Sequence, residues 1–295
     1  MTRTLLLAAL ACAFATPAFA DENLFGYVRG AETLPDGAAE LYFKATERND
    51  KGAGTYRATD YEVEYEYGVS DRFNISGALQ AMSLDTSGLV IDGYLPGDRE
   101  FGLRASGFEV SGKYNILRPA ADGFGLALRG GLEHSWIDKH SGQDKDTTSA
   151  DFDVLMQKYF LDAQLVWVGN VGLEATYAKR KAIADLPADF DWPTNAEMEV
   201  ELKAGTGVSY RFAPNWYASL EALYETEFET DVGQERWSVF AGPSLHYGGQ
   251  RWWATLTWLP QLRGGGEQYA GQADTNLHLI EKTRQEARLK LGFNF

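Results

Sequence analysis

Residues 61–69 read Tyr-Glu-Val-Glu-Tyr-Glu-Tyr-Gly-Val, and this alternation decides the fold. Successive side chains of a β-strand point to opposite faces, so the stretch predicts a strand with one apolar face and one acidic face. The acidic face carries Glu62, Glu64 and Glu66. Residues 196–210 repeat the pattern with Glu197, Glu199, Glu201 and Lys203. The closing residues 286–295 do so again with Glu286, Arg288 and Lys290.

Working outward from these stretches, the same alternation predicts twelve strands of about ten residues, a length that suits a tilted strand crossing a bilayer. The predicted strands cover 38–48, 56–69, 73–83, 107–117, 123–137, 150–160, 164–178, 196–211, 216–227, 235–247, 251–262 and 280–295. The predicted fold is all-β, a closed antiparallel transmembrane barrel of about twelve strands.

The connections between these strands alternate in length. The short ones are 70–72, 118–122, 161–163, 212–215 and 248–250. The long ones are 84–106, 138–149, 179–195 and 263–279, with shorter members at 49–55 and 228–234. An outer-membrane barrel has short periplasmic turns and long outer loops, whereas a soluble sandwich has no reason for this rhythm. Aromatic residues near both strand ends, such as Trp216 and Trp136, match the two interfaces of a membrane.

The first twenty residues have the parts of a secretory signal peptide: Arg3, a short apolar run, and the cleavage pattern Ala18-Phe19-Ala20. Cys12 suggests a lipoprotein only weakly, because the residues before it are a poor lipobox. The predicted organisation is a signal peptide at 1–20, an N-terminal periplasmic segment at 21–37 and an outer-membrane barrel at 38–295.

Composition excludes several classes of function. The net charge of −15 argues against nucleic acid, and the single cysteine argues against disulfide frameworks and multi-cysteine metal sites. Two outer-loop pairs, Asp144 with Asp146 and Asp189 with Asp191, lack the spaced oxygen set of a calcium loop. We expect no metal, no cofactor and no enzymatic activity. The expected partners are outer-membrane lipid and lipopolysaccharide, and no pattern indicates the oligomeric state.

The polar faces of the strands predict a charged lumen. Sixteen inward positions are acidic and seven are basic, an excess that favours cations. The candidate residues for this lumen charge ladder are Glu62, Glu64, Glu66, Glu197, Glu199, Glu201, Arg129, Lys203, Arg236, Arg288 and Lys290. A charged lining is also expected in a barrel without any transport function, because barrel lumens are polar by construction.

Two stretches resemble known proteins. The closing sequence Leu-Lys-Leu-Gly-Phe-Asn-Phe, residues 289–295, resembles the C-terminal signal recognised by the barrel assembly machinery, which the resemblance implies as a partner. The opening sequence NLFGYVRGAETLPDG, residues 23–37, is similar to the start of an uncharacterised family of proteobacterial outer-membrane proteins. That resemblance implies a location in the cell outer membrane and a barrel fold, without an assigned activity.

Three functions are compatible with these patterns. The favoured hypothesis is a small cation-preferring channel or passive solute route. The first alternative is a closed structural or adhesive barrel that acts through its outer loops. The second is a lipid-acting hydrolase, because Ser244 and His246 share the lumen face of one strand, although no orienting acid accompanies them. The apolar loop 85–106 either folds inward, binds a lipid or partner, or packs across the barrel mouth.

Overall fold

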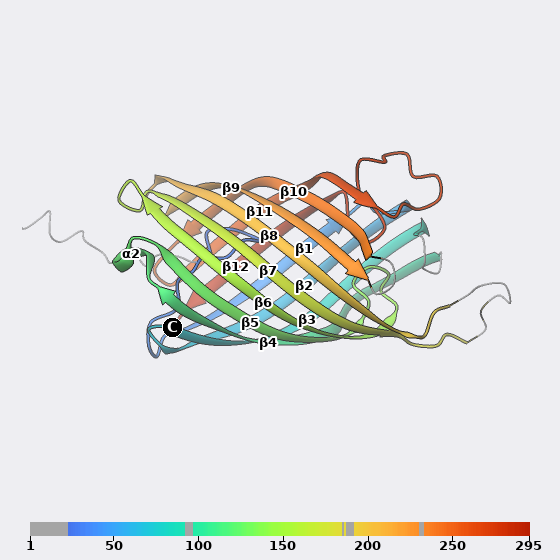
Figure 1. Cartoon of the computed structure of the whole chain (residues 1–295), viewed down its shortest axis with the longest axis horizontal. Coiled ribbons are helices and arrows are strands. Elements are labelled where there is room, and N and C mark those ends of the chain that lie inside the picture. Colours follow the sequence, from blue (N-terminus) through green and yellow to red (C-terminus); the bar gives the residue numbers. More distant parts are fainter. Residues whose placement is uncertain (1–22, 92–96, 185, 187–191, 230–232) are drawn as a thin grey trace, which may run out of the picture.

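The protein is a closed barrel of twelve antiparallel strands, each hydrogen-bonded to its neighbours in sequence (Figure 1). The computed structural model describes residues 23–91, 97–184, 186, 192–229 and 233–295. The predicted signal peptide at 1–20 and the aspartates at 189 and 191 lie outside these residues. The strands are β1 (Ala39–Asn49), β2 (Ala53–Ser70), β3 (Phe73–Val90), β4 (Gly97–Leu117), β5 (Gly125–Ile137), β6 (Asp144–Phe160), β7 (Leu165–Arg180), β8 (Ala196–Ala213), β9 (Trp216–Glu229), β10 (Gly233–Gly248), β11 (Trp252–Gly266) and β12 (Gln285–Asn294).

The barrel closes where β1 pairs with β12, with Phe43 opposite Leu291 and Lys44 opposite Lys290. This pairing removes both free sheet edges, which a lipid environment requires because it offers no water to unpaired backbone groups. The predicted fold class and strand number are therefore confirmed. Within the described ranges, no helix is both long and apolar enough to cross a bilayer.

The alternation of the sequence becomes the two surfaces of the wall. Val63 and Leu202 point outward and are 38% and 44% exposed, whereas Glu64, next to Val63, points into the lumen and is 3% exposed. Aromatic rings gather on the outside near the short turns, where the Tyr247 ring centroid lies 5.1 Å from that of Trp216 and 4.7 Å from that of Trp252. An apolar outer belt bounded by such rings is the arrangement that lipid favours.

Several predicted boundaries are wrong at the long-loop end. The segment 85–106 is not a long loop, because β3 continues to Val90 and β4 begins at Gly97. The inner face of this extension carries Leu84 and Leu89, which pack in the mouth, so it lacks the polar inner face of the other strands, yet backbone pairing continues. The last strand begins at Gln285 rather than at residue 280. A single-turn helix, α2 (Pro119–Asp122), lies in one of the short connections.

Two inserts enter the barrel from its opposite ends (Figure 1). At the end with the short turns, residues 23–32 lie inside the wall and residues 33–37 run along its rim beside Asp71; the sequence predicts all of them as a periplasmic segment. At the other end, residues 138–143 and 277–284, together called the outer insert, fold into the mouth, while most of 267–276 is exposed. There Ile137 and Ile280 join Leu89 and Ile91 in one buried apolar cluster, so the apolar part of 85–106 packs across the mouth.

Candidate functional site

A cavity of about 510 Å³ occupies the lumen between the two inserts. Charged groups from the wall, from residue 29 and from the outer insert line it. Its carboxylates are Asp60, Glu62, Glu109, Glu133, Asp138, Asp151, Asp153, Glu174, Glu199, Glu201, Glu225, Glu227 and Glu286. Its permanent cations are Arg29, Lys44, Arg129, Lys139, Lys145, Lys203, Arg236, Lys282 and Arg288. We call this cavity the chamber.

The predicted charge ladder divides into three groups. Glu62, Glu199, Glu201, Arg129, Lys203, Arg236 and Arg288 line the chamber. Glu64, Glu66 and Lys290 line a second cavity of about 50 Å³, which lies beside the N-terminal segment and also borders Arg129 and Arg288. Glu197 lines neither cavity and forms ion pairs with Arg180 and Lys145. The ladder therefore does not form one continuous acidic track.

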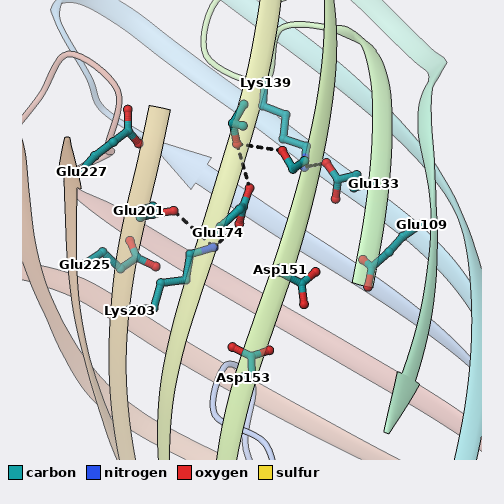
Figure 2. A network of polar contacts seen from close by, with 12 residues as sticks. Glu109, Glu133, Lys139, Asp151, Asp153, Glu174, Glu201, Lys203, Glu225 and Glu227 are labelled. Atoms are coloured by element: carbon teal, nitrogen blue, oxygen red, sulfur yellow. Dashed lines mark hydrogen bonds and ion pairs between the residues drawn. The ribbon is translucent and has the colours of Figure 1, made fainter. Parts of the chain in front are cut away.

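Arg129 is the centre of an ion-pair cluster on one side of the chamber. Its guanidinium pairs with Glu109 of β4 and with Asp151 and Asp153 of β6. Arg129 lies on β5, between these two strands, and is directly opposite Asp153 of β6. Its long side chain reaches Asp151 and Glu109, which lie further along the neighbouring strands. Nearby, Lys139 Nζ lies 2.6 Å from Glu133 Oε1. Figure 2 shows these carboxylates pointing into the same space.

A second cluster lies on the next strands of the wall, where Glu174 of β7 is opposite Asp151 of β6. Lys203 of β8 pairs with Glu174 of β7 and lies 3.2 Å from Glu201 on its own strand (Figure 2). Lys282, from the outer insert, lies 3.1 Å from Glu201 and 2.6 Å from Glu225 of β9. Both clusters place buried charges against opposite charges, which is what makes burial of these groups tolerable.

At the mouth, Arg236 of β10 pairs with Glu227 of β9 and with Glu281 of the outer insert. Glu235 Oε2 lies 3.3 Å from the same guanidinium. Glu281 of the insert therefore faces the cation Arg236 of the wall. The next residue, Lys282, faces the wall carboxylates Glu201 and Glu225. These opposite charges bind residues 281 and 282 to the wall.

Burial and neighbouring cations lower the pKa of three groups at the mouth. Burial, with a further contribution from Arg236, lowers the pKa of His278 to about 3. Burial and Lys51 hold the pKa of His140 well below its usual value. Burial and Arg48 lower the pKa of the Lys51 ammonium, whose Nζ lies 3.2 Å from His140 Nδ1 and 2.8 Å from the Glu281 carbonyl oxygen.

The N-terminal segment is held mainly by side chains of the wall. Glu221 of β9 accepts hydrogen bonds from the backbone N–H groups of Gly26, Tyr27 and Val28, at 2.9, 2.8 and 3.2 Å. Asn170 of β7 accepts from the Arg29 N–H at 2.7 Å. Wall groups therefore satisfy backbone donors that in a helix or strand would pair with other backbone groups.

An apolar socket receives the same segment. Leu24, Phe25 and Val28 pack against Val166 and Val168, which lie on the lumen face of β7. Gly205 and Gly207 of β8 make room for them, since a Cβ at Gly207 would lie 2.5 Å from the Phe25 ring and one at Gly205 would lie 2.7 Å from Val28. The wall is therefore shaped to this segment and not merely covered by it.

Positive groups also surround the segment. Lys290 donates a hydrogen bond to the Asn23 side-chain oxygen, and the Arg288 guanidinium lies 3.6 Å from the centre of the Tyr27 ring. The small inner cavity is lined by two carboxylates and by six cations: Arg29, Lys44, Lys113, Arg129, Arg288 and Lys290. The inner end of the lumen is thus cation-rich, contrary to a uniformly acidic lining.

Ser244 and His246 share the lumen face of β10, as expected, but each binds a different partner. Ser244 Oγ donates to Glu221 Oε1 at 2.6 Å. His246 Nδ1 lies 2.7 Å from Thr255 Oγ1, which itself donates to the Asn23 carbonyl oxygen. Both hydrogen-bond networks lead to the N-terminal segment, so the geometry assigns this pair a role in holding that segment.

Sequence reasoning missed four chamber cations: Arg29, Lys139, Lys145 and Lys282. Arg29 and Lys139 lie outside the predicted strands, and inward positions were read from strand faces only. Lys282 lies within the predicted strand 280–295 but is not among the inward positions counted there. Lys145 was missed because β6 begins six residues earlier than predicted. A signal for the socket was present: Val166 and Val168 are apolar on a lumen face that is otherwise polar.

Comparison with solved structures shows barrels of the same fold. The COG4313 outer membrane channel from Pseudomonas putida F1 is 12% identical, with a TM-score of 0.59 over 90% of this chain and 98% of that chain. The β domain of the Bordetella autotransporter BrkA is 14% identical, with a TM-score of 0.55 over 88% of this chain and 100% of that chain. At these identities the likeness concerns the fold alone.

A search among curated proteins finds no match. The profile of a family of unknown function, DUF6662, matches residues 17–295, nearly the whole chain. This match agrees with the resemblance of the opening residues to an uncharacterised family. The protein is a member of the DUF6662 family and folds as an outer-membrane-type barrel.

Proposed function

We propose that this protein is an outer-membrane channel that gives small charged solutes a passive route, with a preference for cations. The observation that carries the proposal is the chamber of about 510 Å³, which charged side chains line on every side. A structural barrel has no need for so large a polar space, because side chains alone can fill a barrel of this size.

The cation preference is supported by the balance of charges in the chamber, where 13 carboxylates face nine permanent cations. Fixed charge of one sign raises the local concentration of the opposite ion and thereby sets selectivity. The inner cavity adds two carboxylates, Glu64 and Glu66, and two cations, Lys113 and Lys290, so it leaves the excess unchanged. The preference is therefore weaker than the sequence alone predicted.

The location in the outer membrane is supported by three observations of different kinds. The outer surface of the barrel is apolar between aromatic rings. The opening residues have the pattern of an export signal. The solved barrel from Pseudomonas putida F1, which shares the fold, is described as an outer membrane channel.

Reversal potentials across planar bilayers test this function. In a KCl gradient, the protein should conduct and its reversal potential should indicate a moderate preference for K⁺. High salt should reduce that preference, since mobile ions screen fixed charge in a wet pore. A correctly folded barrel without current would contradict the channel, and equal permeability to both ions at low salt would contradict the cation preference.

The two inserts favour a second candidate, a closed structural or adhesive barrel. Residues 23–32 occupy the lumen at the short-turn end, and residues 277–284 fold into the mouth. In that case the outer loops would make the functional contacts, and the bilayer experiment would show no conductance. Lipid hydrolysis receives no support from the contacts of Ser244 and His246.

A further inference from the structure

The ammonium group of Lys282 occupies a position that the barrel wall builds. Its Nζ lies 3.1 Å from Glu201 Oε1 and 2.6 Å from Glu225 Oε2. The two carboxylates belong to neighbouring strands, β8 and β9, while Lys282 belongs to the connection between β11 and β12. Two wall groups therefore hold a cation that comes from a distant part of the chain.

The backbone around Lys282 is fixed on both sides. The carbonyl oxygen of Glu281 accepts a hydrogen bond from Lys51 Nζ at 2.8 Å, and that of Thr283 accepts one from Gln261 Nε2 at 3.0 Å. The Arg284 N–H donates to the Asp50 carbonyl oxygen at 2.7 Å. The main chain therefore stays in place, and the long, flexible lysine side chain is the part that can leave.

The position between the two carboxylates opens onto the chamber, because Glu201, Glu225 and Lys282 all line it. Lys203 lies 3.2 Å from Glu201 and remains as a counter-ion if Lys282 departs. Glu225 forms no other ion pair within the part of the chain that the structure describes. Departure of Lys282 thus leaves one carboxylate exposed to a solute in the chamber.

We propose that Glu201 and Glu225 form a subsite for primary ammonium groups, and that Lys282 is its tethered occupant. The proposal rests on the proposed function, since a solute on a passive route must displace Lys282 to use the subsite. A primary ammonium has three N–H donors, as lysine does, and can donate to both carboxylates at once. A quaternary ammonium has the charge without the donors.

The charge of Lys282 supports this assignment. Burial lowers the pKa of its ammonium, but Glu201 and Glu225 outweigh that effect and hold the pKa above its usual value. The side chain therefore stays charged at neutral pH and competes with any solute cation.

Ligand binding to purified barrels in detergent tests the subsite without requiring conductance. Lys282→Ala removes the occupant, and n-propylammonium replaces the missing end of the side chain. We expect n-propylammonium to bind K282A about tenfold more tightly than it binds the unchanged protein. Arg284→Ala is the matched control, because it removes one positive charge from the same connection, where Arg284 pairs with Asp274 on the surface.

Tetramethylammonium separates a donor-lined subsite from general attraction to negative charge. It should gain much less affinity from Lys282→Ala than n-propylammonium does, because it responds only to the freed charge. Equal binding of n-propylammonium to K282A and R284A would overturn the subsite, and so would binding of tetramethylammonium to K282A as tight as that of n-propylammonium. Lys282→Gln, which keeps most of the side-chain volume, provides the same comparison if K282A folds poorly.

Conductance distinguishes failure of this inference from failure of the proposed function. In a conducting barrel, K282Q should increase the permeability of K⁺ relative to Cl⁻, whereas R284Q should leave it unchanged. If the unchanged protein conducts and the two variants have the same selectivity, the inference is wrong. If no form conducts, the proposed channel is wrong, and n-propylammonium binding alone decides the subsite.

Discussion

Glu221, near the middle of β9, accepts a hydrogen bond from the backbone N–H of Tyr27 at 2.8 Å, across 194 positions of sequence. Its second oxygen accepts from the Gly26 N–H and from the Ser244 hydroxyl. One carboxylate thus joins the N-terminal segment to the wall, and it can do so only as an acceptor. This relationship makes the attachment of the segment testable by a change of one atom.

Glu221→Gln should loosen residues 23–37, because the amide NH₂ of glutamine faces N–H and O–H donors and cannot accept their hydrogen bonds. Leaving buried donors unsatisfied costs about 1–3 kcal/mol each, so the segment should exchange its amide hydrogens faster. Hydrogen–deuterium exchange of the purified barrel measures this. Glu229→Gln, at the outer end of the same strand, should leave exchange in the segment unchanged.

Gly207→Ala should displace the same segment by steric contact. The added methyl group would lie 2.5 Å from the ring of Phe25, which is 1% exposed and has little room to move. Overpacking of this kind costs about 1–3 kcal/mol. Susceptibility of residues 23–37 to added protease should rise, whereas Gly77→Ala, whose Cβ would meet nothing within 4 Å, should have no effect. Equal protease sensitivity of the two variants would argue against the socket.

The outer insert should lose stability as the pH falls below about 6.5, the ordinary pKa of histidine. Burial lowers the pKa of His278 to about 3 in the folded protein, so between these values the unfolded chain binds a proton that the folded chain excludes. Each such group removes up to about 1.4 kcal/mol per pH unit, and above pH 6.5 the contribution of His278 should no longer change with pH.

Amide exchange in residues 277–284, measured from pH 7 to pH 4 and corrected for intrinsic rates, checks this pH dependence. His278→Gln should reduce this pH dependence, and the smaller part that remains is the contribution of His140. His134→Gln, which changes a histidine on the outward side of β5, is the control. A pH dependence that His278→Gln leaves intact would contradict the assignment.

Leu202→Arg should destabilise the barrel in lipid by about 2–4 kcal/mol, because it places a charge on the apolar outer face near the middle of β8. Unfolding by urea from lipid vesicles measures the change. Leu161→Arg, in a short turn and 65% exposed, should have little effect. Comparable destabilisation by both substitutions would indicate that lipid does not cover Leu202.

The wall was predictable from sequence because each strand repeats a two-residue period that one wet face and one lipid face impose. Tyr61–Val69 and Ala196–Tyr210 carry that period almost without interruption, and the length rhythm of the connections then orders the strands. The start of β12 is predicted too early, at residue 280, because residues 280–284 (Ile-Glu-Lys-Thr-Arg) belong to the insert and carry no alternation.

The inserts were not predictable in the same way. Asn23–Gly37 has no period, since its backbone is satisfied by side chains such as Glu221 and Asn170 rather than by a ladder. Lys282 is a loop residue in the fold, and nothing local to it indicates that Glu201 and Glu225 lie opposite. Such contacts depend on how distant strands are arranged around the barrel, which only the closed structure specifies.

The location of Asn23 sets an order of events during assembly. It is held by Thr255 of β11 and Lys290 of β12, which are synthesised last, while Gly37 leads directly into β1. The first residues of the described chain therefore cannot reach their final contacts until the last strands are in place. The barrel therefore closes at the β1–β12 seam around its own first residues, and a chain truncated before β11 would lose both the seam and the two contacts that hold Asn23.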